Sequence, residues 1–385
     1  MQELSIDQKK ALSHLIKWTK KTPTQYITLG GYAGTGKTTL IAILKKHLEE
    51  KKKMKIAMCS YTGKASFVLK STLRKLGFLN KNDFVSTIHS LIYSPITNSK
   101  EEIIGWAKKE ELKYDLIIID EASMVSKEIW QDLLSFNIPL IAVGDHGQLP
   151  PINSEFNLLE KPLLKLEQVH RQAKENPIIE VSMLARTLGH IPTKAFSKNV
   201  MKINQKDPFA SELIEEVLQK EKEDSLVLCG YNNTRIRLNK SIRTLRGFME
   251  EEPEPGEKVI CLRNNHKEGI YNGMLGTIKS IYPENTREYY AEIEMEDTQT
   301  TFKGAILKEQ FNNPVSLNFS KERKKTLTSD LFDYGYALTV HKAQGSQAKT
   351  VVLFEERFSK MDENMWKRWL YTAVTRAQEN LYIIG

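Results

Sequence analysis

A glycine-rich segment near the amino terminus constrains the fold of this chain more than any other feature. Its residues, GYAGTGKT (31–38), follow the apolar run YITLGG (26–31) and precede a stretch, Thr38 to Lys53, whose apolar residues recur three and four apart. The segment matches the pattern GxxxxGK[ST] in the strand–loop–helix context that this pattern requires. In such a loop the backbone N–H groups turn inward around phosphates, and the helix N-terminus adds its partial positive charge. The segment therefore predicts a strand, a phosphate-binding loop and a helix.

Apolar runs and helical segments alternate along the first 230 residues. The runs at 55–60, 116–120 and 139–145 are short, apolar and rich in β-formers, and the stretch from Gly63 to Leu76 has helical periodicity. Because strands buried on both sides are apolar throughout, this alternation predicts a parallel sheet with helices on both faces. Similar apolar runs predict a second sheet of the same kind farther along the chain, at 225–232 and 351–354.

Two stretches depart from this rhythm. Residues 251–330 contain short alternating runs separated by Pro-Gly, Asn-Gly and Gly, which favour a small antiparallel barrel inserted in the second domain. Residues 87–112 carry two apolar patches around the polar segment SPITNSKEE, which favours a β-hairpin inserted in the first domain.

Length and charge favour a multidomain protein with an anionic partner. The 385 residues suffice for about two or three domains. The chain has 56 basic and 48 acidic residues, and a net charge of +8 favours polyanions, of which nucleic acid is the commonest in a cell. Charge alone does not decide, because many lysine-rich proteins bind no polyanion. The run Lys51 to Lys53 fits a solvated helix end better than a phosphate patch.

Other features exclude membrane and secreted classes. The longest apolar runs are far shorter than the ~20 residues that a membrane helix needs, and the first ten residues lack the apolar region of a secretory signal. Cys59, Cys229 and Cys261 lie far apart, without metal-ligand spacing, so buried free thiols in a reducing compartment are expected. We expect a cytoplasmic protein that does not contact membranes.

Acidic and amide side chains follow two of the predicted strands. Asp120 and Glu121 come directly after LIII, at the strand end where open α/β sheets bind ligands. One carboxylate there could hold Mg²⁺ together with the Thr38 hydroxyl, and the other could polarise an attacking water. A helix N-cap is the alternative for this acid pair. Gln148, in GDHGQLPP (144–151), could contact a γ-phosphate or its water; a bland loop with two prolines is its alternative.

Nine segments together resemble the superfamily 1 helicases, in the branch of the Dda- and RecD-like enzymes that move 5′ to 3′. The resemblance covers nearly the whole chain, and its motifs occur in the order typical of the family. They are LSIDQKKAL (4–12), GYAGTGKT (31–38), SYTGKAS (60–66), STIHSL (86–91), DEAS with GDHGQLPP, LEQVHRQ (166–172), ALTVHKAQGSQ (337–347) and YTAVTRA (371–377).

This resemblance implies an α/β fold with two RecA-like P-loop motor domains. Residues 1–86 and 113–176 would form the first motor, and residues 177–250 and 331–385 the second. The stretch 87–112 would be a β-hairpin pin that splits the duplex, and 251–330 an SH3-like β-barrel. Apolar residues of the pin could stack on the last base pair, or could form a small local core instead.

The resemblance also implies roles for individual residues. Lys37, Glu121, Gln148, Arg171 and Arg376 would be catalytic, the two arginines as charged forks near the γ-phosphate; surface salt bridges are the alternative for each arginine. Thr38 and Asp120 would hold Mg²⁺. The ATP contacts implied are Gln8, which would read adenine, Gly34, Thr35, Gly36, Lys37, Thr38, Thr39 and Gly345.

Residues from both motors would contact DNA. His341 and Lys342 offer donors to a phosphate backbone, although a lone histidine such as His341 is more often buried and satisfied. The full implied set is Thr62, Gly63, Lys64, Thr87, His89, Asn272, Thr339, His341 and Lys342.

The function expected from the resemblance is that of an ATP-dependent DNA helicase. Its partners would be single-stranded and forked duplex DNA; the chain would act as a monomer, and contact with a single-strand-binding protein or replisome stays open. The alternatives are an RNA-directed motor and an ATPase that remodels nucleoprotein without separating strands. A P-loop small-molecule kinase is a third class, for which nucleic acid would not stimulate the ATPase.

Overall fold

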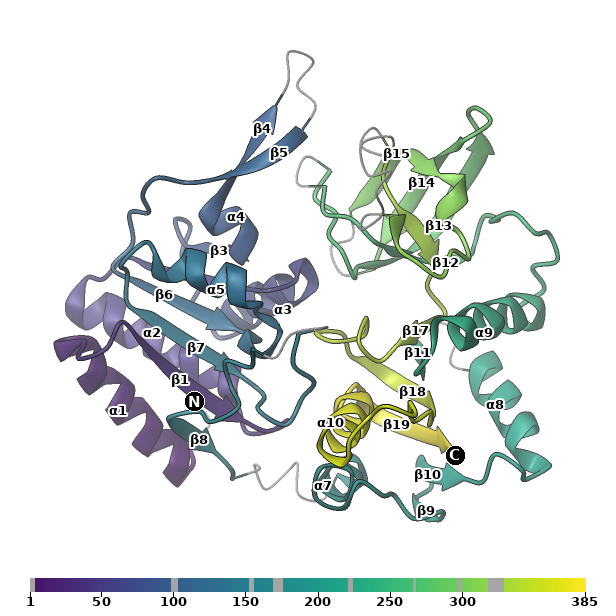
Figure 1. Ribbon diagram of the computed structural model, residues 1–385, viewed down its shortest axis with the longest axis horizontal. Coiled ribbons are helices and arrows are strands. Elements are labelled where there is room, and N and C mark those ends of the chain that lie inside the picture. The colour runs from purple at the N-terminus through teal and green to yellow at the C-terminus, as the bar shows by residue number, and fades with distance from the viewer. Residues whose placement is uncertain are drawn as a thin grey trace. The chain divides into compact units, whose positions relative to one another are not determined.

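The computed structural model describes residues 4–97, 103–151, 156–168, 176–220, 224–265, 268–296, 300–317 and 329–385. The chain divides into two compact units, residues 1–176 and residues 177–385. Helices and strands alternate in both units (Figure 1). Within the described ranges, no helix is long and apolar enough to cross a membrane.

A parallel sheet forms the centre of the first unit. Its strands are β1 (Tyr26–Gly31), β2 (Ile56–Ser60), β3 (Phe84–Thr87), β6 (Leu116–Asp120), β7 (Leu140–Gly144) and β8 (Leu164–Leu166). They lie in the order β3-β2-β6-β7-β1-β8, and each neighbouring pair is parallel. Strands β2, β6 and β7 are buried at every residue, as their continuous apolar runs predicted. The predicted parallel α/β architecture is confirmed.

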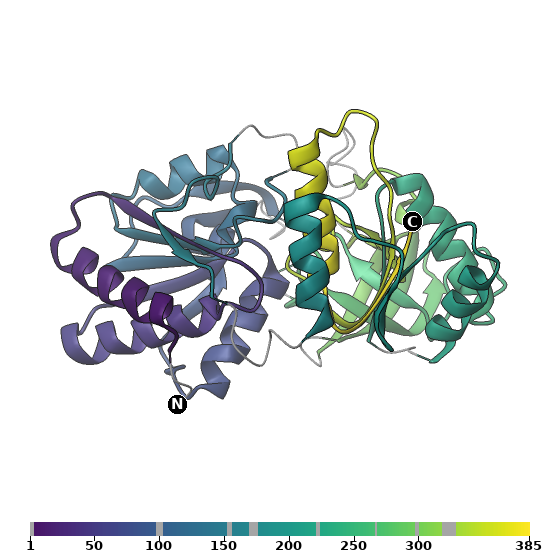
Figure 2. The ribbon, with the colours of Figure 1, turned by 90° about the horizontal axis from the view of Figure 1, so that it is seen from below.

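Helices cover both faces of this sheet (Figure 2). Alternate residues of β6 point to opposite faces: Ile118 joins a core shared with three helices, and Ile119 joins a core shared with two others. The helices that contribute to the first core are α1 (Ile6–Lys21), α2 (Lys37–Lys52) and α3 (Gly63–Lys75). Those that contribute to the second are α4 (Ile88–Ile92) and α5 (Lys127–Leu134). A short 3₁₀ turn, Ala122–Met124, follows β6.

An antiparallel hairpin projects from the first unit beyond α4 (Figure 1). Its strands are β4 (Tyr93–Thr97) and β5 (Ile103–Lys108). The sequence prediction began this hairpin at residue 87, but Thr87 ends β3 and caps α4, whose Leu91 and Ile92 are buried in the core. We therefore correct its start to residue 93. The error arose because a short apolar run has the same pattern in a buried helix as in a strand.

A second, mainly parallel sheet forms the centre of the second unit. Its strands are β9 (Ala195–Ser197), β10 (Val200–Ile203), β11 (Ser225–Cys229), β17 (Ala337–Thr339), β18 (Ala348–Phe354) and β19 (Ala377–Ile384). They lie in the order β17-β11-β18-β19-β10-β9, and β9 runs antiparallel to β10. Two helices, α8 (Phe209–Lys220) and α9 (Asn232–Leu245), share a core with β11. Two others, α7 (Pro177–Leu188) and α10 (Glu363–Val374), pack against each other.

An antiparallel sheet is inserted between α9 and β17, and we call it the inserted sheet. It consists of β12 (Lys258–Cys261), β13 (Leu275–Pro283), β14 (Glu288–Met295), β15 (Thr301–Leu307) and β16 (Phe332–Tyr334), and a 3₁₀ turn, Lys308–Gln310, follows β15. Its order is β15-β14-β13-β12-β16, and its inward side chains form a core of their own. Because β16 pairs with β12, the insertion extends to Tyr334, past the predicted boundary at residue 330.

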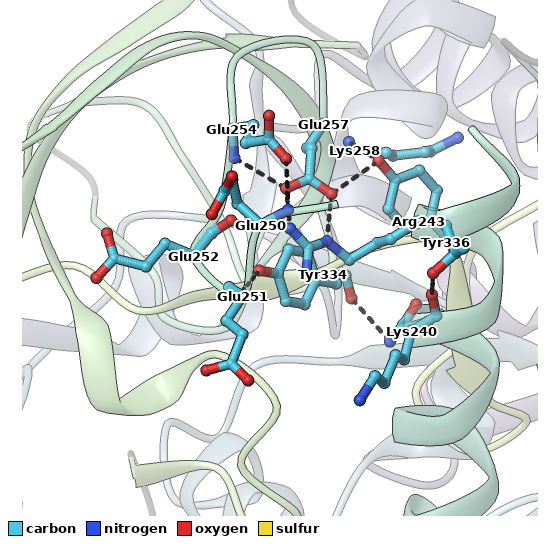
Figure 3. A network of polar contacts seen from close by, with 12 residues as sticks. Lys240, Arg243, Glu250, Glu251, Glu252, Glu254, Glu257, Lys258, Tyr334 and Tyr336 are labelled. Carbon is cyan, nitrogen blue, oxygen red and sulfur yellow. Dashed lines mark hydrogen bonds and ion pairs between the residues drawn. The ribbon is translucent and has the colours of Figure 1, made fainter. Parts of the chain in front are cut away.

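A buried ion pair joins the inserted sheet to α9 (Figure 3). Arg243 donates from Nε to Glu257 Oε1 at 2.6 Å and from Nη2 to Glu257 Oε2 at 2.9 Å. The Arg243 guanidinium lies over the Tyr334 ring, 4.3 Å from its centroid. The Tyr336 hydroxyl donates to Glu257 at 3.3 Å and accepts from the Lys258 N–H at 3.1 Å. The chain segments that enter and leave the inserted sheet are thus held together at one point.

Candidate active site and nucleic-acid interface

The glycine-rich loop between β1 and α2 has the shape that a phosphate site needs. Gly34 (φ 76°) and Gly36 (φ 72°) adopt left-handed backbone conformations that residues with a Cβ avoid. Among the residues that the structure describes, no side chain caps the N-terminus of α2, so its N–H groups can bind an anion. The Lys37 ammonium donates to the carbonyl oxygens of Gly31 (2.9 Å) and Tyr32 (3.1 Å), within the same loop. Thr35, Thr38 and Thr39 lie in the loop and the first turn of α2.

Thr38, in the first turn of α2, meets Asp120 at the carboxyl end of β6. The Thr38 hydroxyl donates to Asp120 Oδ2 at 3.0 Å. Asp120 is 6% exposed, and burial raises the pKa of its carboxyl, while Lys37 and the hydrogen bonds from Glu121 and Thr38 oppose that rise. A hydroxyl and a buried carboxylate are the hard oxygen ligands that Mg²⁺ prefers. Among the described residues, no cluster of three or more His, Cys, Asp or Glu forms a separate metal site.

Glu121 has an unusual backbone conformation. Its φ of 54° is in the left-handed region, which costs free energy for any residue with a Cβ. Its N–H donates to Asp120 Oδ1 at 3.0 Å, and the Ser60 hydroxyl donates to the Asp120 carbonyl at 3.0 Å. Two successive acids therefore have different places: Asp120 accepts from Thr38, and Glu121 occupies the N-cap position of the 3₁₀ turn Ala122–Met124.

Gln148 is packed against an acidic residue that the sequence analysis did not assign. Gln148 (4% exposed) donates from Nε2 to Asp145 Oδ2 at 3.4 Å, and Asp145 (1% exposed) also accepts from the Gly147 N–H at 2.9 Å. Asp145 thus shapes the turn that carries Gln148. It follows the end of β7 as Asp120 ends β6, so the rule that singled out Asp120 could have found it.

The Gln8 amide is engaged with the phosphate loop. Its Nε2 donates to the Thr35 carbonyl at 2.9 Å, and its Oε1 accepts from the Ser5 N–H at 2.9 Å in a capping box at the start of α1. The neighbouring Asp7 accepts from the N–H groups of Glu167 and Gln168 at 2.9 Å each. Burial acts to raise the pKa of the Asp7 carboxyl. The hydrogen bond from the Ser5 hydroxyl and these backbone bonds outweigh burial, so that this pKa lies below its ordinary value. Adenine recognition by Gln8 stays a prediction.

Of the two predicted arginines, the structure describes Arg376 but not Arg171, which lies outside the described residues. Arg376 is 3% exposed and bonds within its own unit: Nε donates to the Thr372 carbonyl (2.9 Å), Nη1 to the Ser346 carbonyl (3.1 Å) and Nη2 to Thr375 Oγ1 (3.1 Å). This guanidinium links the end of α10 to the loop after β17.

The predicted nucleic-acid contacts of the first unit follow adjacent strands. Thr62 and Thr87 each accept a backbone N–H bond with their hydroxyl, so they cap α3 and α4. Gly63 and Lys64 lie in the first turn of α3, where Lys64 is 7% exposed. His89 lies between two tyrosine rings, at 6.3 Å from Tyr61 and 5.6 Å from Tyr93. Since Ser60 of β2 pairs with Thr87 of β3, both segments emerge at one edge of the sheet.

In the second unit, Thr339 ends β17, and His341, Lys342 and Gly345 follow it. Burial lowers the pKa of His341. Burial, and then the nearby Arg235 guanidinium, lowers the pKa of Lys342 to about 8, although Asp333 opposes the shift. Asn272 is exposed and lies in the turn between β12 and β13, where Gly273 has a φ of 92°. The structure therefore brings these residues to strand ends and turns; their contact with DNA stays a prediction.

Two family models match this chain. The model of the AAA domain matches residues 3–200, slightly more than half of the chain, and that of the UvrD-like helicase C-terminal domain matches residues 334–384. The chain belongs to the AAA domain family. The two family matches and the helicase relatives support the expected Dda- and RecD-like branch of superfamily 1. The first match spans the phosphate loop, Asp120 and Gln148, and the second spans Lys342 and Arg376.

Similar proteins are found in bacteria and archaea. The chain is 29% identical to the ATP-dependent RecD2 DNA helicase of Deinococcus radiodurans over 388 residues, covering 93% of this chain and 47% of that protein. It is 24% identical to the ATP-dependent DNA helicase Pif1 of Campylobacter jejuni, covering 91% and 86% of the two chains. The chain is also 25% identical to an uncharacterised protein of Methanocaldococcus jannaschii, of which it covers 36%. The chain thus spans less than half the length of the first and third of these relatives.

Solved structures share the fold. The Bacteroides Pif1 helicase in complex with ADP-AlF3 and single-stranded DNA has a TM-score of 0.58 at 17% identity, covering 100% of this chain and 92% of that one. A structure of Pif1 helicases at forked double-stranded DNA gives 0.57 at 18% identity, with the same coverage. At this identity the likeness establishes the α/β fold with RecA-like parallel sheets, in agreement with the two sheets described above.

Proposed function

We propose that this chain is an ATP-dependent DNA helicase that moves 5′ to 3′ on single-stranded DNA and separates duplex DNA. The observation that carries this proposal is the shared sheet edge of the first unit. The phosphate loop, the Thr38–Asp120 pair and Glu121 lie at the carboxyl ends of β1 and β6. The segments of Thr62 and His89 leave the neighbouring strands β2 and β3 at that edge. Nucleotide chemistry and strand contact can therefore influence each other directly.

The residues of the nucleotide site divide the chemistry among them. Lys37 and the N–H groups of the loop would bind the phosphates, while Thr38 and Asp120 would hold Mg²⁺. When bound, this ion would neutralise charge on the transferring phosphoryl group. Glu121 would accept a proton from the attacking water, and Gln148, held by Asp145, would orient that water beside the γ-phosphate. Arg171 and Arg376 would add positive charge, for which Arg376 must leave its bonds to Thr372 and Ser346.

The relatives support DNA as the substrate. The RecD2 and Pif1 relatives carry the name of DNA helicase, and the solved Pif1 complexes contain single-stranded or forked DNA. We assign the 5′-to-3′ direction from the resemblance of the motifs to the Dda- and RecD-like branch. We also assign the β4–β5 hairpin as the pin, the inserted sheet as an SH3-like barrel, and the monomer as the acting species.

Partial duplexes with either a 5′ or a 3′ single-stranded tail test this proposal. We expect ATP-driven unwinding of the 5′-tailed DNA substrate only. Unwinding from the 3′ tail would refute the direction, and a preference for an RNA tail would favour an RNA-directed motor. An ATPase that nucleic acid does not stimulate would favour a small-molecule kinase.

The hairpin distinguishes a helicase from an ATPase that only remodels nucleoprotein. Base stacking contributes about 1–3 kcal/mol per base, comparable with the opening of one pair, so a short wedge suffices. Deleting residues 95–101 and joining the ends with Gly-Gly should leave DNA-stimulated ATPase and translocation largely intact, while unwinding falls sharply. A variant that unwinds normally would place the wedge elsewhere, with the turn at Asn272 as the next candidate.

A further inference from the structure

Three aromatic rings connect the edge of the first sheet to the hairpin. Tyr61 follows β2 and His89 lies in α4, directly after β3; because β2 and β3 are neighbours, the two rings lie 6.3 Å apart in an edge-on arrangement. His89 and Tyr93 are four residues apart at the end of α4, which places them on the same side, and their ring centroids are 5.6 Å apart. Tyr93 is also the first residue of β4. The residue expected to contact DNA, His89, thus touches the base of the hairpin.

One carboxylate of α5 holds both strands of the hairpin at this base. The Tyr93 hydroxyl donates to Asp132. Lys108 of β5 is the register partner of Tyr93, and its ammonium lies 3.6 Å from Asp132 and 3.0 Å from the Ser135 hydroxyl. Since Lys108 and Asp132 are partly exposed, solvent weakens their ion pair, and the bond of Tyr93 is the stronger link. Burial, followed by the Asp132 carboxylate, raises the pKa of Tyr93, so its hydroxyl remains a donor at physiological pH.

A second attachment secures the strand that leaves the hairpin. The Lys109 N–H donates to the Ile92 carbonyl at 2.9 Å. The Lys109 ammonium donates to the carbonyl oxygens of Ser90 and Leu91, at 2.9 Å each, at the end of α4. These carbonyls have no partner within a helix this short, so a lysine is a suitable cap. The hairpin is therefore held to α4 and α5 at both of its ends.

We propose that Tyr93 is a positioning residue that fixes the hairpin, through Asp132, at a set angle to the strand-binding edge around His89. The inference rests on the proposed function: a pin separates duplex only if it resists the strand that the motor pulls past it. A pin that yields would let the motor consume ATP without opening base pairs. Tyr93 and Asp132 would therefore determine how many base pairs are opened per ATP, without taking part in hydrolysis.

Tyr93→Phe isolates this role, because it keeps the ring against His89 and removes only the hydroxyl bonded to Asp132. Three quantities are measured on the full chain: ATPase stimulated by single-stranded DNA, thermal unfolding, and base pairs opened per ATP on a tailed duplex. We expect an unchanged ATPase, a melting temperature lowered by no more than a few degrees, and a fall of about tenfold in base pairs per ATP, the low end for losing a hydrogen bond to a charged group. Tyr26→Phe, on β1, is the matched control and should change none of them.

A double-variant comparison tests the partner. If Tyr93 and Asp132 act as one unit, the double variant Tyr93→Phe with Asp132→Ala should open as many base pairs per ATP as Asp132→Ala alone. The inference would be overturned if Tyr93→Phe opened as many base pairs per ATP as the wild type. It would also be overturned if Tyr93→Phe lowered the ATPase rate and the unwinding rate in the same proportion. Absence of unwinding by the wild type itself on any tailed duplex would overturn the proposed function and this inference with it. The two failures are thus distinguishable.

Discussion

Removing one partner of the Arg243–Glu257 ion pair should destabilise the second unit more than neutralising both partners. Glu257 is completely buried and Arg243 is 5% exposed, and two hydrogen bonds of 2.6 and 2.9 Å join them. Burial acts to lower the pKa of Arg243, but the Glu257 carboxylate outweighs it and raises that pKa. The two side chains are therefore paired in a buried position (Figure 3).

The unpaired Glu257 carboxylate sets the size of the expected loss of stability. Arg243→Met leaves the Glu257 carboxylate buried without its cation and should lower the free energy of unfolding by about 3–5 kcal/mol. Glu257→Gln, added to that variant, replaces the carboxylate with a neutral amide of similar volume. The one oxygen of the amide can accept from the Glu254 N–H, as Glu257 Oε2 does, and its NH2 group can donate to the oxygen of the Tyr336 hydroxyl, which donates to Glu257 Oε1 in the wild type. The double variant should recover about 1–3 kcal/mol, the cost of an unsatisfied buried polar group.

Hydrogen–deuterium exchange of the full chain, read by mass spectrometry, is a suitable assay because it reports the stability of each segment. Peptides spanning β12 and β16 should lose protection in Arg243→Met and partly regain it in the double variant, while peptides of the first unit serve as an internal reference. The matched control is Glu294→Gln, which breaks the exposed Lys279–Glu294 pair of the same sheet. Its effect should stay below about 1 kcal/mol.

Two outcomes would refute this reasoning about the buried pair. A double variant that is as unstable as Arg243→Met would show that the lost packing of the guanidinium on Tyr334, and not the unpaired charge, sets the cost. An equal cost for the exposed pair would show that burial does not distinguish the two pairs.

The remaining predictions concern the nucleotide and DNA sites. Lys37→Ala should abolish ATP hydrolysis and leave single-strand binding measurable by fluorescence anisotropy; hydrolysis at the normal rate would contradict the site. Glu121→Gln should retain ATP yet hydrolyse it about 10²–10⁴-fold more slowly, because an amide cannot accept the proton of water; loss of ATP binding would indicate a structural role instead. Affinity for single-stranded DNA should fall as the pH rises through about 8, where Lys342 loses its proton and charge, and Lys342→Arg should flatten that dependence. An equally steep profile in Lys342→Arg would exclude this lysine as the cause.

Part of the candidate site could be predicted because it depends on chain order alone. In a parallel sheet the carboxyl ends of the strands meet at one edge, so the residues that follow apolar runs must lie near one another. Thr38 and Asp120 are 82 positions apart and hydrogen-bonded for this reason. The same rule, applied once more, would have found Asp145. The hairpin start at residue 87 failed because periodicity does not distinguish short apolar helices from strands.

The phosphate loop, the parallel α/β class and the acid pair that ends β6 could be predicted from the residues alone. Each of these follows from local patterns and from the fixed direction of parallel strands. The hydrogen-bond partners of individual side chains became known from the folded chain: Gln8 bonds to the Thr35 carbonyl, Arg376 to the Ser346 carbonyl, and Tyr93 to Asp132. Such bonds depend on how helices pack on a sheet and which rotamer each side chain then adopts. No residue spacing encodes that packing, because it arises from contacts across the whole core.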